Sequence, residues 1–155
     1  MSPWIACLLL IVGGYVLLAW LASKVAPAEP VLRTIVGWSY GVRVVLTLGF
    51  FFISFWKLPI LTSLQMPEGF WTFGLDCITY HAYGVKIVEA WNWGIELPHP
   101  GLGIEYYAVI ALMYKLLGSA HPLYPALVNS LMAAANGLLA YLIVKRLADR
   151  RAAFW

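Results

Sequence analysis

Asp76, Tyr80 and His81 are the residues whose types and spacing are best suited to chemistry. A carboxylate held at a membrane surface beside a histidine or a lysine is suited to act as a general base. The alternative is structural, because an Asp that opens a helix is a preferred N-cap and accepts a hydrogen bond from a backbone N–H two or three residues further on. One side chain can serve both roles.

Histidines and acidic residues of the same region raise the question of a metal site. Asp76, His81, His99 and Glu105 could be drawn together by a suitable fold, and a metal site needs at least three converging ligands. Their spacing matches no known metal-binding signature, and ordinary interfacial histidines are the simpler interpretation. The sequence therefore predicts no metal site.

The composition determines the class of protein that must position these residues. Of the 155 residues, 63% are hydrophobic and 11% are charged, and the mean hydropathy is +0.81. A soluble domain has roughly 45–50% apolar and about 25% charged residues. Because backbone polar groups in lipid must be satisfied within helices, the sequence predicts an all-α integral membrane protein. The net charge of +3 is spread along the chain, which argues against a nucleic-acid partner.

Three stretches are long and apolar enough to cross a bilayer, which requires about 20 helical residues. They cover residues 4–23, 35–56 and 123–146. A fourth span within residues 104–118 is the alternative, but that stretch is short and contains Glu105 and Lys115.

The distribution of positive charge favours three spans and sets their orientation. With three spans, most of the cations gather on one side of the membrane: Lys24, Arg33, Lys145, Arg146, Arg150 and Arg151. Lys57, Lys86 and Lys115 fall on the other side, within the loop of residues 57–122. The sequence therefore predicts this loop on the external side of an inner or plasma membrane.

The long loop is predicted to contain two surface helices, near residues 76–93 and 104–118. Apolar residues of the first stretch fall near helical spacing, and Pro and Gly residues then break the chain before the second. Tryptophans and tyrosines supply an aromatic belt at headgroup depth. Residues 1–34 are interpreted as an extra N-terminal span with a short cytoplasmic turn, and residues 35–155 as the main module.

Small and polar residues within the predicted spans indicate helix packing. Gly37 and Gly41 have the small-xxx-small spacing that lets helices approach closely. Asn129, Ala133 and Asn136 share one face of the last span, which is more typical of a packing seam than of a substrate contact. We therefore expect other membrane protein chains as partners, in addition to membrane lipid.

An ordered set of weak motifs gives the sequence a family resemblance. Asp76 is followed by Tyr80-His81-Ala82, a Gly/Pro break, the run YYAVIALMYKLLG at residues 106–118, His121-Pro122-Leu123, and a helix that ends in the basic run from Lys145. This order, across roughly residues 35–153, resembles the N-terminal part of GT-C membrane glycosyltransferases. That superfamily includes protein mannosyltransferases, aminoarabinose transferases and oligosaccharyltransferase catalytic subunits.

The resemblance implies a reaction and a set of site residues. GT-C enzymes move a sugar from a polyprenyl-phosphate carrier to an acceptor, and their first external loop carries an acidic residue at the start of a juxtamembrane helix. Asp76 matches this catalytic position. Tyr80 and His81 match the residues that follow and are implied to line the substrate cavity. The carrier phosphate needs a cation, for which the loop residues Lys86 and Lys115 are the candidates, with Arg43 of the second span as the alternative.

Two departures from the family pattern bear on activity. Cys77 stands where many members have a second acid, so a paired-carboxylate metal site is not expected, and a divalent metal stays open as a cofactor. Members also generally have far more spans, so the chain is interpreted as a truncated, split or remodelled module. The alternative function is a non-catalytic accessory subunit of a larger membrane complex.

Overall fold

The computed structural model describes residues 2–95 and 104–147, and its regular elements there are helices. The α-helices are α1 (Pro3–Val25), α2 (Pro30–Phe55), α3 (Leu75–Trp93), α4 (Ile104–Leu117) and α5 (Leu123–Leu147). Short 3-10 helices occupy Thr62–Leu64, Pro67–Gly69 and Thr72–Gly74, between α2 and α3. The predicted all-α fold is confirmed, and the two expected loop helices correspond to α3 and α4.

Helices α1, α2 and α5 are long and apolar enough to cross a membrane, with 23, 26 and 25 residues. No more than 28% of the most apolar window of each is buried within the protein, so most of their apolar surface is available to lipid. Helix α4 has 14 residues, about 21 Å at 1.5 Å per residue, which is shorter than a hydrocarbon core of about 30 Å. The chain is therefore an integral membrane protein with three candidate spans in the described residues.

The chain divides into two compact units, which are described separately. Unit 1 comprises residues 1–8 and 47–126, and unit 2 comprises residues 9–46 and 127–155. Helices α1, α2 and α5 each contribute a segment to both units.

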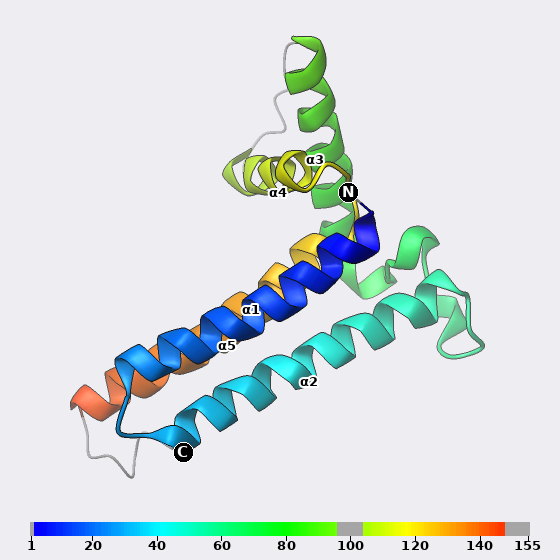
Figure 1. The fold of residues 1–155 in the computed structure, drawn as a ribbon. Helices are drawn as coiled ribbons and strands as arrows, with labels where there is room; N and C mark the ends of the chain where they lie inside the picture. Colours follow the sequence, from blue (N-terminus) through cyan, green and yellow to red (C-terminus); the bar gives the residue numbers. More distant parts are fainter. Residues whose placement is uncertain (1, 96–103, 148–155) are drawn as a thin grey trace. The chain divides into compact units, whose positions relative to one another are not determined.

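Unit 2 is built from the long segments of α1, α2 and α5, with α2 running opposite to the other two (Figure 1). Tyr40 of α2 is 2% exposed, and its hydroxyl oxygen lies 3.3 Å from the carbonyl oxygens of Leu10 and Ile11 in α1. Gly14 makes room for this hydroxyl, because a Cβ there would lie 2.5 Å from it and 3.5 Å from Leu131 of α5. The three helices therefore meet around Tyr40.

An ion pair joins the turn between α1 and α2 to the last turns of α5. Lys145 Nζ donates a hydrogen bond to Glu29 Oε1 at 2.8 Å, and Glu29 is only 3% exposed. A buried charge is costly unless it is paired, so this contact helps to hold the end of α5 against the turn.

The residues predicted to pack helices differ in how closely a neighbouring helix approaches them and in how far they are buried. A Cβ at Gly37 would lie 3.2 Å from the Tyr15 ring, so this glycine allows α1 to approach α2, whereas nothing lies within 4 Å of a Cβ at Gly41. On α5, Ala133 is half-buried and both Asn129 and Asn136 are exposed. The buried residues of α5 within unit 2 are Leu127, Ser130, Ala134, Leu138 and Tyr141. Asn136 is therefore not among the residues of α5 that are buried in the described part of the chain.

In unit 1, α3 packs closely against α4 (Figure 1). The helices approach closely at Gly84, where a Cβ would lie 2.7 Å from Ile110 Cγ2 and 3.3 Å from the Tyr114 ring. A small core between the helices contains Ile87, Tyr107 and Ala111, with Tyr80, Tyr83 and Val88 packed against it.

Replacing Gly84 with alanine should destabilise unit 1, because the added Cβ would collide with Ile110. Overpacking costs about 1–3 kcal/mol, against about 1 kcal/mol gained from better helix propensity. The control is Gly49→Ala in α2, where nothing lies within 4 Å of the new Cβ and stability should be unchanged or higher. Thermal unfolding in detergent, followed by circular dichroism, compares the two variants. Equal melting temperatures would contradict the close approach of α3 to α4.

Candidate functional site

The loop between α2 and α3 is tied to the end of α2 by side chains that donate to backbone carbonyls. The Ser54 hydroxyl is fully buried and lies 2.6 Å from the Phe70 carbonyl oxygen and 3.1 Å from that of Met66. Lys57 Nζ donates to the same Met66 oxygen at 2.6 Å. The Phe70 carbonyl oxygen also accepts the Met66 N–H at 2.9 Å, so backbone and side-chain bonds together hold the loop in one conformation.

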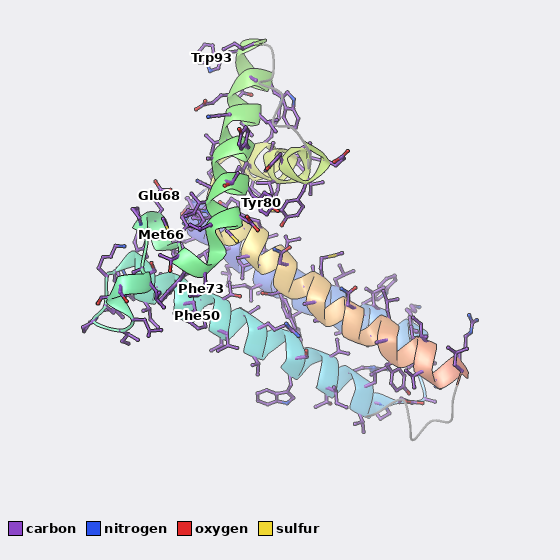
Figure 2. All side chains as sticks on the ribbon, turned by 180° about the vertical axis from the view of Figure 1, so that it is seen from behind. Phe50, Met66, Glu68, Phe73, Tyr80 and Trp93 are labelled. Atoms are coloured by element: carbon purple, nitrogen blue, oxygen red, sulfur yellow. The ribbon has the colours of Figure 1, made fainter. Side chains whose placement is uncertain are left out.

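Aromatic rings fix the last part of this loop. Trp71 Nε1 donates to the Phe50 carbonyl oxygen at 3.0 Å, and the Trp71 and Phe73 rings stack with centroids 5.4 Å apart. The Phe50 ring meets both rings edge-on, and Figure 2 shows Phe50 and Phe73 close together. Gly69, at φ 83°, lies against the Phe51 ring, 2.5 Å from where a Cβ would be. This packing sets the point at which α3 begins.

Asp76 is the second residue of α3, because Leu75 opens the helix and Gly74 is its N-cap. The expectation that Asp76 itself is the N-cap is therefore wrong. A carboxylate in the first turn is still stabilised by the helix dipole. Asp76 is exposed and makes no hydrogen bond or ion pair with another described residue. Partial burial, followed by the nearby Asp76 carboxylate, raises the pKa of the Tyr80 hydroxyl above its usual value.

Tyr80 lies one turn after Asp76, on the side of α3 that faces α4 (Figure 2). Its ring contacts Tyr106 edge-on at a centroid distance of 4.7 Å and Tyr107 at 5.4 Å. Such aromatic contacts contribute about 0.5–1.5 kcal/mol each beyond area burial. Tyr80 therefore helps to hold α3 on α4 while lying beside the candidate base.

His81 forms the polar centre of the α3–α4 contact. Its Nδ1 lies 2.8 Å from the Tyr114 hydroxyl, and its Nε2 lies 3.9 Å from a carboxylate oxygen of Glu68 in the preceding loop. Its ring also lies against the Phe70 ring, with centroids 5.6 Å apart. Burial lowers the pKa of His81, and the Glu68 carboxylate opposes only part of this effect. His81 is therefore neutral at neutral pH.

The neighbours of His81 favour one of its two neutral tautomers. Burial raises the pKa of Tyr114, so its hydroxyl stays protonated and can donate to His81 Nδ1. The tautomer with its proton on Nε2 accepts this bond and also directs an N–H toward the Glu68 carboxylate. His81 is thus held between a donor and a carboxylate.

His121 lies at the start of α5 and is built into the same unit. Its Nδ1 accepts the Leu123 N–H at 3.3 Å, which satisfies one of the free donors of the first turn. Its ring lies against the rings of Trp4, Phe51 and Tyr124 at centroid distances of 5.4, 5.6 and 5.6 Å. Burial, and then the proximity of His81, lowers the pKa of His121.

The structure does not bring Lys86 or Lys115 to Asp76. Lys86 Nζ lies over the Tyr83 ring at 5.3 Å, and Lys115 Nζ lies over the Trp91 ring at 5.5 Å. Along α3, Lys86 follows Asp76 by about 15 Å and Trp91 follows it by about 22 Å, at 1.5 Å per residue. Both cations therefore belong to the other half of the α3–α4 pair, toward the end marked by Trp93 in Figure 2.

The residues around Asp76 do not fit a divalent metal. Cys77 follows Asp76 in place of a second carboxylate, and the described residues contain no group of three or more His, Cys, Asp or Glu side chains arranged to hold a metal ion. His99, one of the candidate ligands, lies outside the described residues. Cys7 and Cys77 are free thiols.

Sequence reasoning assigned no role to Glu68, Tyr114 or the His121 side chain. Glu68 adopts a left-handed conformation, at φ 59°, in a short 3-10 helix, and no sequence pattern marks it. Tyr114 does lie two turns after Tyr107, at the spacing of one helix face. That spacing was the one signal that could have indicated a buried tyrosine opposite α3.

No protein-family model, curated protein or solved structure matches this chain.

Lowering the pH from about 7.5 to about 5.5, across the range in which an ordinary histidine titrates, should decrease the free energy of unfolding. The pKa values of His81 and His121 are lowered from 6.5 in the folded protein, so the unfolded chain binds more protons in this range. Their contribution to stability is fully present above pH 6.5 and is lost as the pH falls through the lowered pKa values. Thermal unfolding in detergent across this pH range measures the effect.

His81→Gln should flatten this pH dependence, because glutamine keeps an oxygen that can accept from Tyr114 and carries no titrating group. The double variant with His121→Gln should be flatter still. A slope in the double variant equal to that of the unmodified chain would assign the pH dependence to other groups.

Proposed function

We propose that this chain is the N-terminal module of a GT-C-like membrane glycosyltransferase, which transfers a sugar from a polyprenyl-phosphate carrier to an acceptor. The order of elements supports the proposal: a spanning helix, an anchored loop, two shorter helices and a second spanning helix follow one another as α2, α3, α4 and α5. This is the order that the sequence motifs suggested.

The placement of Asp76 is the observation that supports the proposal most directly. The carboxylate lies in the first turn of a helix that directly follows a spanning helix and its ordered loop. It is exposed and has no hydrogen-bond partner among the residues described. A structural carboxylate would be expected to cap the helix or to pair with a cation, and Asp76 does neither. It is available to an external ligand.

In the proposed reaction Asp76 is the general base. It accepts the proton of an acceptor hydroxyl, the acceptor oxygen forms a bond to the anomeric carbon of the sugar, and the bond from that carbon to the carrier phosphate breaks. The carrier leaves as polyprenyl phosphate with the bonding electron pair. Tyr80, one turn after Asp76, and His81 beside it would position the acceptor.

The carrier phosphate needs a cation near the sugar, and the spacing along α3 favours a group other than Lys86 or Lys115. Lys86 follows Asp76 by about 15 Å along α3, and Lys115 contacts Trp91, which follows Asp76 by about 22 Å. The phosphate, in contrast, is bonded directly to the sugar that reacts. We propose that this cation comes from a partner membrane chain or from a segment beyond the described residues.

The proposal includes the orientation of the chain in the membrane. Lys24 at the end of α1, Arg33 at the start of α2, and Lys145 and Arg146 at the end of α5 form the basic ends of the spans. By the positive-inside rule these ends are cytoplasmic. The loop with α3 and α4 is then external, in an inner or plasma membrane.

Asp76→Asn should reduce sugar transfer by about 10²–10⁴-fold, because the amide cannot accept the acceptor proton. The matched control is Glu89→Gln, which neutralises another exposed carboxylate of α3 and should leave transfer within a factor of about two. Transfer of a labelled sugar from a polyprenyl-phosphate donor, measured in native membranes, compares the variants. Unimpaired transfer by the Asp76→Asn variant would refute the assignment.

A second function is favoured by a different observation, the exposure of Asn136 in the middle of α5. An amide that faces lipid is unfavourable, so such residues usually hydrogen-bond to another helix. We propose that this face packs against another membrane chain. If that chain carries the activity, this protein is a non-catalytic accessory subunit.

Asn136→Leu should weaken such an association by about 0.6 kcal/mol, the average for a hydrogen bond between membrane helices, and by no more than about 1.7 kcal/mol. Asn92→Leu makes the same change on an exposed position of α3 and is the control. Gentle detergent extraction followed by mass analysis reports the stoichiometry of co-purifying chains. A partner with its own activity, lost in the Asn136 variant and retained in the control, would establish the accessory role. Equal recovery from both variants would exclude this face as the contact.

A further inference from the structure

A cavity of about 510 Å³ lies in unit 2, at the end of α5. It is lined by Val25, the last residue of α1, and by Leu142, Ile143, Lys145 and Arg146 near the end of α5. Its volume falls within the range of roughly 300–1,000 Å³ that is usual for small-molecule sites. The reaction proposed above does not use this cavity.

The lining combines two kinds of surface in a fixed order along α5. Leu142, Ile143 and Val25 present apolar surface, and Val25 and Ile143 are 42% and 58% exposed. Lys145 and Arg146 lie two and three residues after Ile143, in the last turn of the spanning helix. Apolar surface within the span and cations at its end match the two parts of a phospholipid, an acyl chain and a charged headgroup.

The two cations are not equivalent. Lys145 donates to the buried Glu29 carboxylate at 2.8 Å, which holds its side chain in place and offsets part of its charge. Arg146 is exposed, and no described residue forms an ion pair with it. A guanidinium can bind two phosphate oxygens at once, so Arg146 is the better phosphate ligand of the pair.

The surrounding charge favours an anion over a zwitterion. Lys24 is in the last turn of α1 and Arg33 is near the start of α2, so both lie at the helix ends that the turn of residues 26–29 connects. The described charges of these helix ends are Lys24, Glu29, Arg33, Lys145 and Arg146. Four cations against one carboxylate produce a positive field at this site.

We infer that this cavity is a binding site for the phosphate group of an anionic phospholipid, with Arg146 as the main ligand, Lys145 as a second donor, and the apolar wall of Val25, Leu142 and Ile143 against the acyl chain. A free phosphate anion shares the headgroup chemistry but has nothing to place on the apolar wall. The site is therefore assigned to the lipid rather than to a soluble anion.

The test uses the full chain reconstituted in nanodiscs of phosphatidylcholine with a minor fraction of phosphatidylglycerol, then released into mild detergent for native mass spectrometry. We expect phosphatidylglycerol to be retained in preference to phosphatidylcholine. Arg146→Gln should reduce this retention by about fivefold, which corresponds to about 1 kcal/mol for one basic residue at an anionic surface. Arg33→Gln, an exposed arginine at the same helix ends but outside the cavity lining, should reduce it by less than about twofold, because solvent and salt screen a charge that does not contact the bound phosphate.

Three results would overturn the inference. Equal losses in the Arg146 and Arg33 variants would mean that a diffuse positive field, rather than the cavity, attracts the lipid. Equal retention of phosphatidylcholine and phosphatidylglycerol by the unmodified chain would remove the role of the headgroup charge. Displacement of phosphatidylglycerol by millimolar inorganic phosphate would show that the site takes a free anion, whereas continued retention supports the lipid assignment.

Discussion

The burial of the Ser54 hydroxyl at the end of α2 is the interaction on which the geometry of the candidate site depends. Residues 56–74 contain only short helical turns, so most of their carbonyls need partners from outside regular structure. An unsatisfied buried polar group costs about 1–3 kcal/mol, and the buried Ser54 hydroxyl finds acceptors in the carbonyls of Phe70 and Met66. Trp71 also donates to the Phe50 carbonyl, so the loop is held against the end of α2 up to residue 71. Helix α3 begins four residues later, at Leu75, which makes Asp76 its second residue.

The spanning helices were predictable because hydropathy is a property of consecutive residues. The expected spans 4–23, 35–56 and 123–146 fall at α1, α2 and α5, and the largest difference is the start of α2 at Pro30. Proline is well suited to the first position of a helix, and Arg33 can extend toward the headgroups from the first turns. Hydropathy marks the part of a helix that lies in hydrocarbon, whereas capping determines where the helix itself begins.

The site was only partly predictable, because its contacts join distant positions. The placement of Tyr80 one turn after Asp76 follows from helical periodicity. The pairing of His81 with Tyr114 joins residues 33 positions apart, and it depends on Gly84 letting α4 approach α3. The contacts of Lys86 with the Tyr83 ring and of Lys115 with the Trp91 ring likewise depend on packing. The sequence shows only that these residues are positively charged, and on that basis it suggested a phosphate site that their positions do not favour.

The packing of α3 against α4 bears on which of three side chains, Asp76, Tyr80 or His81, can serve as a base. His81 is the residue that usually titrates near neutral pH, but its Nδ1 is hydrogen-bonded to the Tyr114 hydroxyl and burial lowers its pKa, which makes it a weaker base. In the tautomer that carries the proton on Nε2, no lone pair of the ring is free to accept another proton. Tyr80 is likewise protonated, because its pKa is raised. Asp76 is therefore the member of this trio with a carboxylate, and that carboxylate has no hydrogen-bond partner in the described structure.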